Sequence, residues 1–153
     1  MSADRLAADL IGVGGTLQPF DGAGDLLAGL KHLWLRIVVV SNSTYRDAEM
    51  YRRDFAARGW WELIDAVVTS VDVGYAKPSE VICRAALTLS QSALRECVMI
   101  GDTEELDIVP ARSLGMRTIL VAIERPAPAH IDADACVESL TEVVAALRSM
   151  HLG

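Results

Sequence analysis

The sequence predicts a three-layer α/β domain, in which a parallel sheet lies between two layers of helices. Short apolar runs alternate along the chain with segments whose apolar residues recur at helical spacing, a pattern typical of βαβ units. The runs are apolar at nearly every position, which indicates strands buried on both faces. The 153 residues suit one domain, 1–153, and no linker, repeat or low-complexity segment divides them.

Six strands are expected from the apolar runs, most of them rich in β-branched residues, which favour strands. They are Ala7–Val13, Arg36–Val40, Ala66–Thr69, Cys97–Ile100, Arg117–Ala122 and the short pair Cys136–Val137. Glycine or polar residues follow several of these runs. The carboxyl ends of parallel strands meet at one edge of a sheet, and ligands of open α/β sheets bind there. These loops are therefore where we expect the functional site.

Helices are expected where apolar residues recur every three or four positions. They cover Ala23–Leu33, a segment capped within Ser41–Thr44 and running to Arg58, Pro78–Leu89, Glu104–Leu114 and Leu140–Met150, with a short helical turn at Trp60–Ile64 and loops at Ser70–Lys77 and Glu124–Asp134. One or both of Trp60 and Trp61 are predicted to pack under the preceding helix, with an interface patch as the alternative. Arg46, Arg52 and Arg53 are predicted to form a solvated face.

The composition argues against several classes of partner. Lys and Arg number 14 and Asp and Glu 21, so the net charge is −7, which disfavours general nucleic-acid or membrane-surface binding but allows a local anion site. No apolar run reaches the roughly 18 residues of a membrane span. The N-terminus lacks the features of a signal peptide, and we expect a cytoplasmic protein. The cysteines, which we expect to be reduced and buried, are Cys83, Cys97 and Cys136.

Four short motifs stand at the ends of predicted strands or in the loops beyond them. They are Gly12-Val13-Gly14-Gly15-Thr16-Leu17, Ser41-Asn42, Lys77-Pro78, and Gly101-Asp102 with Asp107. In type and order they resemble the four motifs of the haloacid dehalogenase superfamily of phosphatases, whose first motif reads Asp-x-Asp-Gly-Thr-Leu. The resemblance extends from about Ala7 to Leu147 and implies the Rossmann-like fold of that superfamily.

The resemblance also implies a role for each matching position. In the family, the first aspartate attacks phosphorus, the second is the general acid and base, and carboxylates hold Mg²⁺. Ser41, Asn42 and Lys77 are thereby expected to bind an anion. Asp102 and Asp107 are candidates to hold a cation, or to fix the position of Lys77.

The first motif departs from the family pattern at the positions that carry the chemistry. Gly12 stands where the nucleophile would be, and Gly14 where the acid and base would be. We therefore predict that aspartyl-phosphate catalysis is absent and that any Mg²⁺ site is weakened, so that no cofactor is expected. The backbone N–H groups of Gly14, Gly15 and Thr16 could form an anion nest instead.

Other glycine-rich sites fit this turn less well. A dinucleotide site requires a third glycine or alanine where Leu17 stands, and no Gly-Lys-Ser/Thr of a Walker motif follows. The short intervals between motifs leave no room for a lid domain, which makes a protein partner or a homo-oligomer plausible. Three functions stay open: an anion-binding or assembly module, a weak Mg²⁺-dependent phosphoester hydrolase, and a structural subunit.

Overall fold

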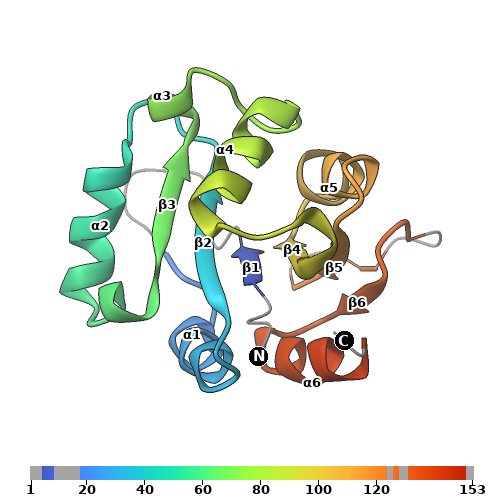
Figure 1. The fold of residues 1–153 in the computed structure, drawn as a ribbon. Coiled ribbons are helices and arrows are strands. Elements are labelled where there is room, and N and C mark those ends of the chain that lie inside the picture. Colours follow the sequence, from blue (N-terminus) through green and yellow to red (C-terminus); the bar gives the residue numbers. More distant parts are fainter. Residues whose placement is uncertain (1–4, 9–17, 124–125, 128–130, 151–153) are drawn as a thin grey trace.

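A parallel sheet in the order β3-β2-β1-β4-β5-β6 forms the middle layer of the protein (Figure 1). The computed structural model describes residues 5–8, 18–123, 126–127 and 131–150. The strands are β1 Arg5–Ala8, β2 Arg36–Ser41, β3 Ala66–Thr69, β4 Cys97–Gly101, β5 Arg117–Val121 and β6 Ala135–Val137. Every neighbouring pair is parallel. The predicted α/β class is confirmed.

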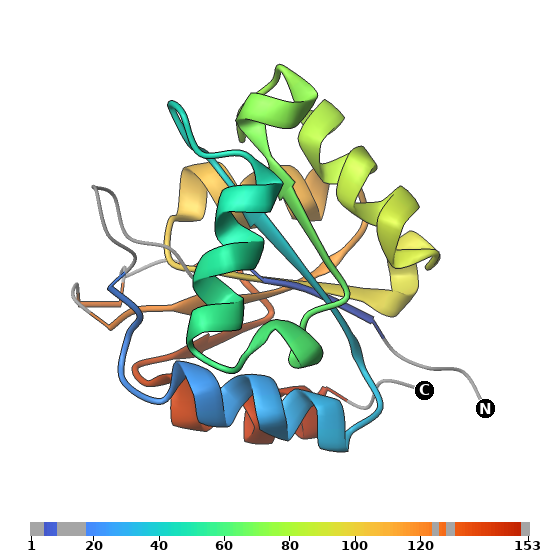
Figure 2. The ribbon, with the colours of Figure 1, turned by 90° about the vertical axis from the view of Figure 1, so that its left-hand side faces the viewer.

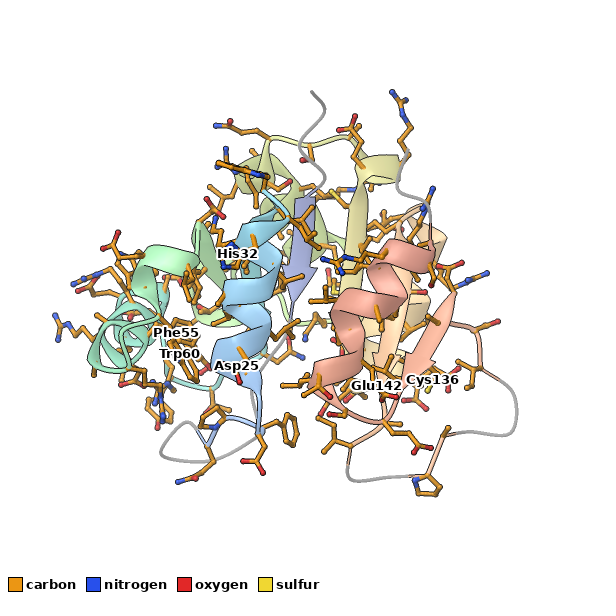
Figure 3. All side chains as sticks on the ribbon, turned by 90° about the horizontal axis from the view of Figure 1, so that it is seen from below. Asp25, His32, Phe55, Trp60, Cys136 and Glu142 are labelled. Carbon is orange, nitrogen blue, oxygen red and sulfur yellow. The ribbon has the colours of Figure 1, made fainter. Side chains whose placement is uncertain are left out.

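Helices cover both faces of the sheet. They are α1 Ala23–His32, α2 Ala48–Ala57, α3 Ser70–Val73, α4 Glu80–Ser90, α5 Val109–Ser113 and α6 Val143–Ser149. Figure 2 shows the sheet nearly edge-on, with α1 and α6 below it and α4 and α5 above it. Figure 3, seen from below, shows α1 and α6 side by side on the lower face. No helix within the described residues has the length and apolar character of a membrane span.

Two apolar cores lie on opposite faces of the sheet because side chains alternate along each strand. In β2, Ile37 and Val39 join the core beneath α1 and α6, whereas Val38 and Val40 join the core beneath α4. These four side chains are fully buried. Burial on both faces explains why Ile37 to Val40 are all apolar, as the sequence predicts for a buried strand.

Some boundaries differ from those that the sequence predicts. The expected loop Ser70–Lys77 contains helix α3, because the Thr69 side chain caps it by accepting a hydrogen bond from Asp72 N. The helix expected from Pro78 begins at Glu80, since Ser79 is its N-cap. Likewise α2 is capped by Asp47 and not within Ser41–Thr44.

Three further elements depart from a simple strand or helix. The predicted helix Glu104–Leu114 starts with a π-helical turn, Glu104–Ile108, in which Val109 N donates to Glu104 O; Pro110 has no N–H to continue an ordinary ladder. A 3₁₀ turn over Leu140–Glu142 precedes α6. Strand β1 begins at Arg5, and the end of the predicted strand lies outside the described residues.

The tryptophans that follow α2 pack inward, as the sequence predicts. Trp60 and Trp61 are partly buried against the core beneath α1, and Figure 3 shows Trp60 beside that helix. A Cβ at Gly24 would lie only 2.9 Å from Trp60 Nε1. The absence of a side chain at Gly24 therefore lets the indole approach α1 closely.

Candidate anion site at the carboxyl edge of the sheet

The predicted site residues gather where the central strands end. Ser41 is the last residue of β2, and Gly101 is the last residue of β4. Both strands flank β1 in the sheet, and Ala8 at the end of β1 pairs with Val39 of β2 and Ile100 of β4. The first-motif residues, Gly12 to Thr16, lie outside the described residues. The other three motifs lie within the described residues.

A buried ion pair joins the third and fourth motifs. Lys77 Nζ lies 2.7 Å from Asp107 Oδ1, and the two side chains are only 2% and 1% exposed. Nζ also lies 3.5 Å from Val40 O, and the second carboxylate oxygen of Asp107 accepts a hydrogen bond from Thr103 N at 3.1 Å. Both oxygens of Asp107 are thus engaged, and its contact with Lys77 matches the second of the two roles considered for it.

Gly101 makes room for this carboxylate. A Cβ built on Gly101 would overlap the Cβ, Cγ and Oδ2 atoms of Asp107. The glycine is therefore required by the close approach of a side chain, and not by its backbone angles. The sequence shows the glycine, but only the structure shows that it faces Asp107.

Asn42 holds the backbone of Lys77 from both sides. Its Oδ1 accepts a hydrogen bond from Lys77 N at 2.7 Å, and its Nδ2 donates to Lys77 O at 3.0 Å. The peptide bond that follows, between Lys77 and Pro78, is cis. Asn42 was predicted as a ligand-binding residue, and the structure places its amide on the main chain of Lys77. It thereby couples the loop after β2 to the loop that carries the lysine.

Ser41 is buried at the end of β2 and bonded to a residue that the sequence analysis missed. Its Oγ lies 2.9 Å from the hydroxyl of Tyr51 in α2, and both residues are about 1% exposed. Tyr51 and Phe55 follow a helical spacing, so in the sequence Tyr51 is indistinguishable from an ordinary core residue. The useful signal was the phenol group itself, because buried tyrosine hydroxyls usually find a partner.

Arg46 corrects the prediction of a solvated arginine face. Its guanidinium lies 4.8 Å from the centre of the Tyr51 ring and forms an ion pair with Asp54. Its side chain is only 12% exposed. Arg52 and Arg53 do lie at the surface, where both pair with Glu49.

A hydrogen-bonded brace holds together the loops that follow β2 and β3. Ser43 N donates to Ser70 Oγ, and Ser70 Oγ donates to Ser43 O, each over 2.8 Å. Asp72 accepts from Ala48 N at 2.9 Å and from Thr69 Oγ1 at 2.6 Å. The start of α2 is therefore hydrogen-bonded to α3.

The two acids predicted as cation ligands differ in their surroundings. Asp107 accepts hydrogen bonds from Lys77 and Thr103 N. Asp102, in contrast, is exposed and accepts a hydrogen bond from Thr103 Oγ1 at 3.1 Å. The described part of the chain holds no group of three or more His, Cys, Asp or Glu side chains able to bind a metal.

Comparison with known proteins identifies the family that this arrangement resembles. The family model described as "Haloacid dehalogenase-like hydrolase" matches residues 9–121, which is most of the chain. This range includes all four motifs that the sequence analysis singled out.

Curated relatives match over a similar length of the chain. "Haloacid dehalogenase-like hydrolase domain-containing protein 3" of Bos taurus is 34% identical over 111 residues, covering 72% of this chain and 43% of the relative. "Glyceraldehyde 3-phosphate phosphatase" of Methanothermobacter thermautotrophicus is 35% identical over 109 residues, covering 71% of this chain and 46% of the relative. The chain thus spans less than half the length of these relatives.

The fold is shared with solved structures. A phosphatase of the same superfamily from Thermococcus onnurineus superposes with a TM-score of 0.74 at 23% identity, over 86% of this chain and 59% of that chain. The likeness at this level of identity concerns the fold alone.

Proposed function

This chain belongs to the haloacid dehalogenase-like hydrolase family, and from that premise we propose that it binds phosphate-type anions without forming an aspartyl-phosphate. One observation carries the proposal. The cation that would hold a phosphate, Lys77, is fixed by Asp107 and Asn42, whereas the nucleophile and acid–base positions are Gly12 and Gly14. The lysine expected to position a phosphate is thus present, whereas the side chains that would react with it are absent from the sequence.

The placement of Ser41 and Lys77 supports anion binding. They bring a hydroxyl and a cation to the carboxyl edge of the sheet, which is where open α/β sheets bind their ligands. Glycine at positions 12 and 14 also means that the first motif lacks the two carboxylates of the family pattern. A site with fewer carboxylates is more favourable for an anion, because like charges repel most strongly where water is scarce.

The same substitutions argue against covalent catalysis. A carboxylate nucleophile divides phosphoryl transfer into two easier steps, and neither position can supply one. Loss of the nucleophile in a well-studied hydrolase lowers turnover by about 10⁶-fold. With the acid–base group missing as well, we expect turnover close to the background rate.

Binding can be tested with inorganic phosphate, followed by calorimetry. We expect saturable binding to the wild-type protein and its loss in Lys77→Met, with circular dichroism showing that the variant is folded. Lys31→Met is the matched control, because it also removes a lysine paired with an aspartate, Asp65, but on α1. Equal phosphate affinity in Lys77→Met and wild type would contradict the proposal.

Weak hydrolysis is the second candidate, since two of the curated relatives are named as phosphatases. A p-nitrophenyl phosphate assay with and without Mg²⁺ separates the two functions. The anion-binding proposal expects no Mg²⁺-dependent turnover by the wild type. Turnover that persists through purification and is lost in Asp102→Ala would establish the hydrolase instead.

Restoration of the first motif tests whether the rest of the site is intact. We expect Gly12→Asp combined with Gly14→Asp to introduce Mg²⁺-dependent turnover, because these changes return the missing nucleophile, acid–base group and metal carboxylate. The matched control adds Asp102→Ala to the double variant and should abolish the gained turnover. No gain in the folded double variant would mean that the remaining site no longer supports the reaction.

A further inference from the structure

A hydrogen bond between Ser41 and Tyr51 connects the candidate site to helix α2. Ser41 Oγ and Tyr51 OH are 2.9 Å apart and buried. The other bond of Ser41 Oγ runs to Asn42 O over 3.4 Å, which is long for a hydroxyl donor. The phenol therefore makes the shorter of the two contacts recorded for this serine.

The number of protons determines what this pair can do. A serine hydroxyl has one proton to donate and can accept two hydrogen bonds. If Ser41 donates to Asn42 O, the proton between the two hydroxyls must come from Tyr51. Ser41 can then turn its own proton from the long bond to Asn42 toward a bound anion, while it keeps the bond from Tyr51.

We propose that Tyr51 is a positioning residue, which donates to Ser41 Oγ and thereby directs the Ser41 proton toward the anion; this inference rests on the proposed phosphate site. A hydroxyl that accepts one bond becomes a better donor, since linked hydrogen bonds polarise each other. Tyr51 stabilises the bound anion only through Ser41.

The surroundings of Tyr51 hold its ring in one orientation. The Arg46 guanidinium lies 4.8 Å from the ring centre, and the Phe55 ring lies 6.2 Å away. Arg46 is in turn paired with Asp54. Because the ring is packed from more than one side, the hydroxyl reaches Ser41 without an additional loss of side-chain freedom when an anion binds.

A double-mutant cycle measures whether Tyr51 acts through Ser41. Inorganic phosphate is titrated by calorimetry into wild type, Tyr51→Phe, Ser41→Ala and the double variant. We expect Tyr51→Phe to weaken the wild-type affinity by about threefold to fivefold, which is less than the roughly tenfold contribution of a hydrogen bond to a charged ligand, because Tyr51 bonds to Ser41 and not to the anion. In the Ser41→Ala background, the same change should have an effect of less than about twofold.

Two further variants separate positioning from a general effect on the fold. Tyr75→Phe also removes one phenol hydroxyl, but from a side chain that is 56% exposed, and should leave phosphate affinity unchanged. Ser41→Thr keeps a hydroxyl and should bind phosphate and remain sensitive to Tyr51→Phe. Thermal unfolding of each variant records any loss of stability separately from affinity.

Each outcome decides between the possibilities. If Tyr51→Phe lowers the phosphate affinity equally with and without the Ser41 hydroxyl, Tyr51 acts by supporting the fold and the inference is wrong. If Tyr51→Phe binds like wild type, the inference fails while the proposed anion site stands. If the wild type binds no phosphate, the proposed function fails, and the inference fails with it.

Discussion

At the scale of single residues, the buried pair of Lys77 and Asp107 is the most demanding feature of the molecule. Two charged groups are tolerated here because each is the other's partner, Val40 O also accepts from Lys77, and Thr103 N satisfies the remaining carboxylate oxygen. Removal of one partner takes the opposite charge away from a group that stays buried.

Asp107→Asn should therefore lower the free energy of unfolding by about 3–5 kcal/mol, the usual effect of breaking a buried pair. Urea denaturation measures this value. Glu80→Gln is the control, because it breaks the pair with Arg84 on the exposed face of α4, where pairs contribute about 0–1 kcal/mol. A similar loss in both variants would show that burial does not determine the contribution of the Lys77 pair.

Gly101→Ala tests the close approach of the strand end to Asp107. The added methyl group overlaps the Asp107 side chain, so we expect a loss of about 1–3 kcal/mol, as for overpacked sites. Combining it with Asp107→Gly should remove the overlap, so that Gly101→Ala has a smaller effect in that background. Equal effects in both backgrounds, measured in urea, would mean that Asp107 does not set the requirement for glycine.

At the scale of elements, α2 brings Tyr51 to Ser41 and is itself fixed at its N-terminus. The Asp47 side chain accepts a hydrogen bond from Met50 N at 2.9 Å. Asp47→Ala should cost about 1 kcal/mol, as the loss of an N-cap usually does. It should also weaken phosphate binding less than Tyr51→Phe does, because the brace between Asp72 and Ala48 remains.

The surface of α2 also carries a pH-dependent contribution to stability. Hydrogen bonds from Arg52, and then Arg53, lower the pKa of Glu49 from 4.5 to about 2. Since the pKa is lower in the folded state, the contribution is complete above about pH 4.5 and is lost as the pH falls toward 2. The midpoint temperature of thermal unfolding should therefore fall more over this pH range for the wild type than for Glu49→Gln. The difference should shrink in high salt, because the group is exposed; identical pH profiles would contradict this account.

At the scale of the whole molecule, the reactivity of the cysteines measures how accessible the core between the sheet and its helices is to solvent. Cys83 and Cys97 are buried in the core beneath α4, whereas Cys136 in β6 is partly exposed. Burial, followed by Glu138 and Glu142, raises the pKa of the Cys136 thiol, and Figure 3 shows Cys136 near Glu142. In the native protein, Cys136 is thus the thiol open to reagents, and it is a poor nucleophile at neutral pH.

A disulfide exchange reagent should therefore label one thiol slowly in the folded protein and all three in denaturant. Labelling of Cys136 should speed up as the pH rises, because the thiolate is the reacting form. Cys136→Ser should abolish the native labelling without affecting the other two thiols. Rapid native reaction of Cys83 or Cys97 would show that the layer above the sheet opens readily.

Much of the whole-molecule arrangement could be predicted because its causes are local. Strand and helix periodicities are properties of neighbouring residues, and their alternation restricts the topology to a parallel sheet with helices on both faces. The boundaries were less predictable, since they depend on caps such as Asp47 and Ser79. The order of the four motifs was also sufficient to indicate the family, and it predicts a site at the carboxyl edge of the sheet.

Which polar groups meet there was decided only by the tertiary structure. Lys77 is 30 residues from Asp107 and 35 from Asn42, and no local pattern reports contacts between residues so far apart. Tyr51 has the spacing of a core residue, and only its position against β2 makes it a partner of Ser41. Periodicity thus determined the sheet and its layers, whereas long-range packing of buried polar groups determined the site, because a hydrogen bond depends on where two atoms meet in space.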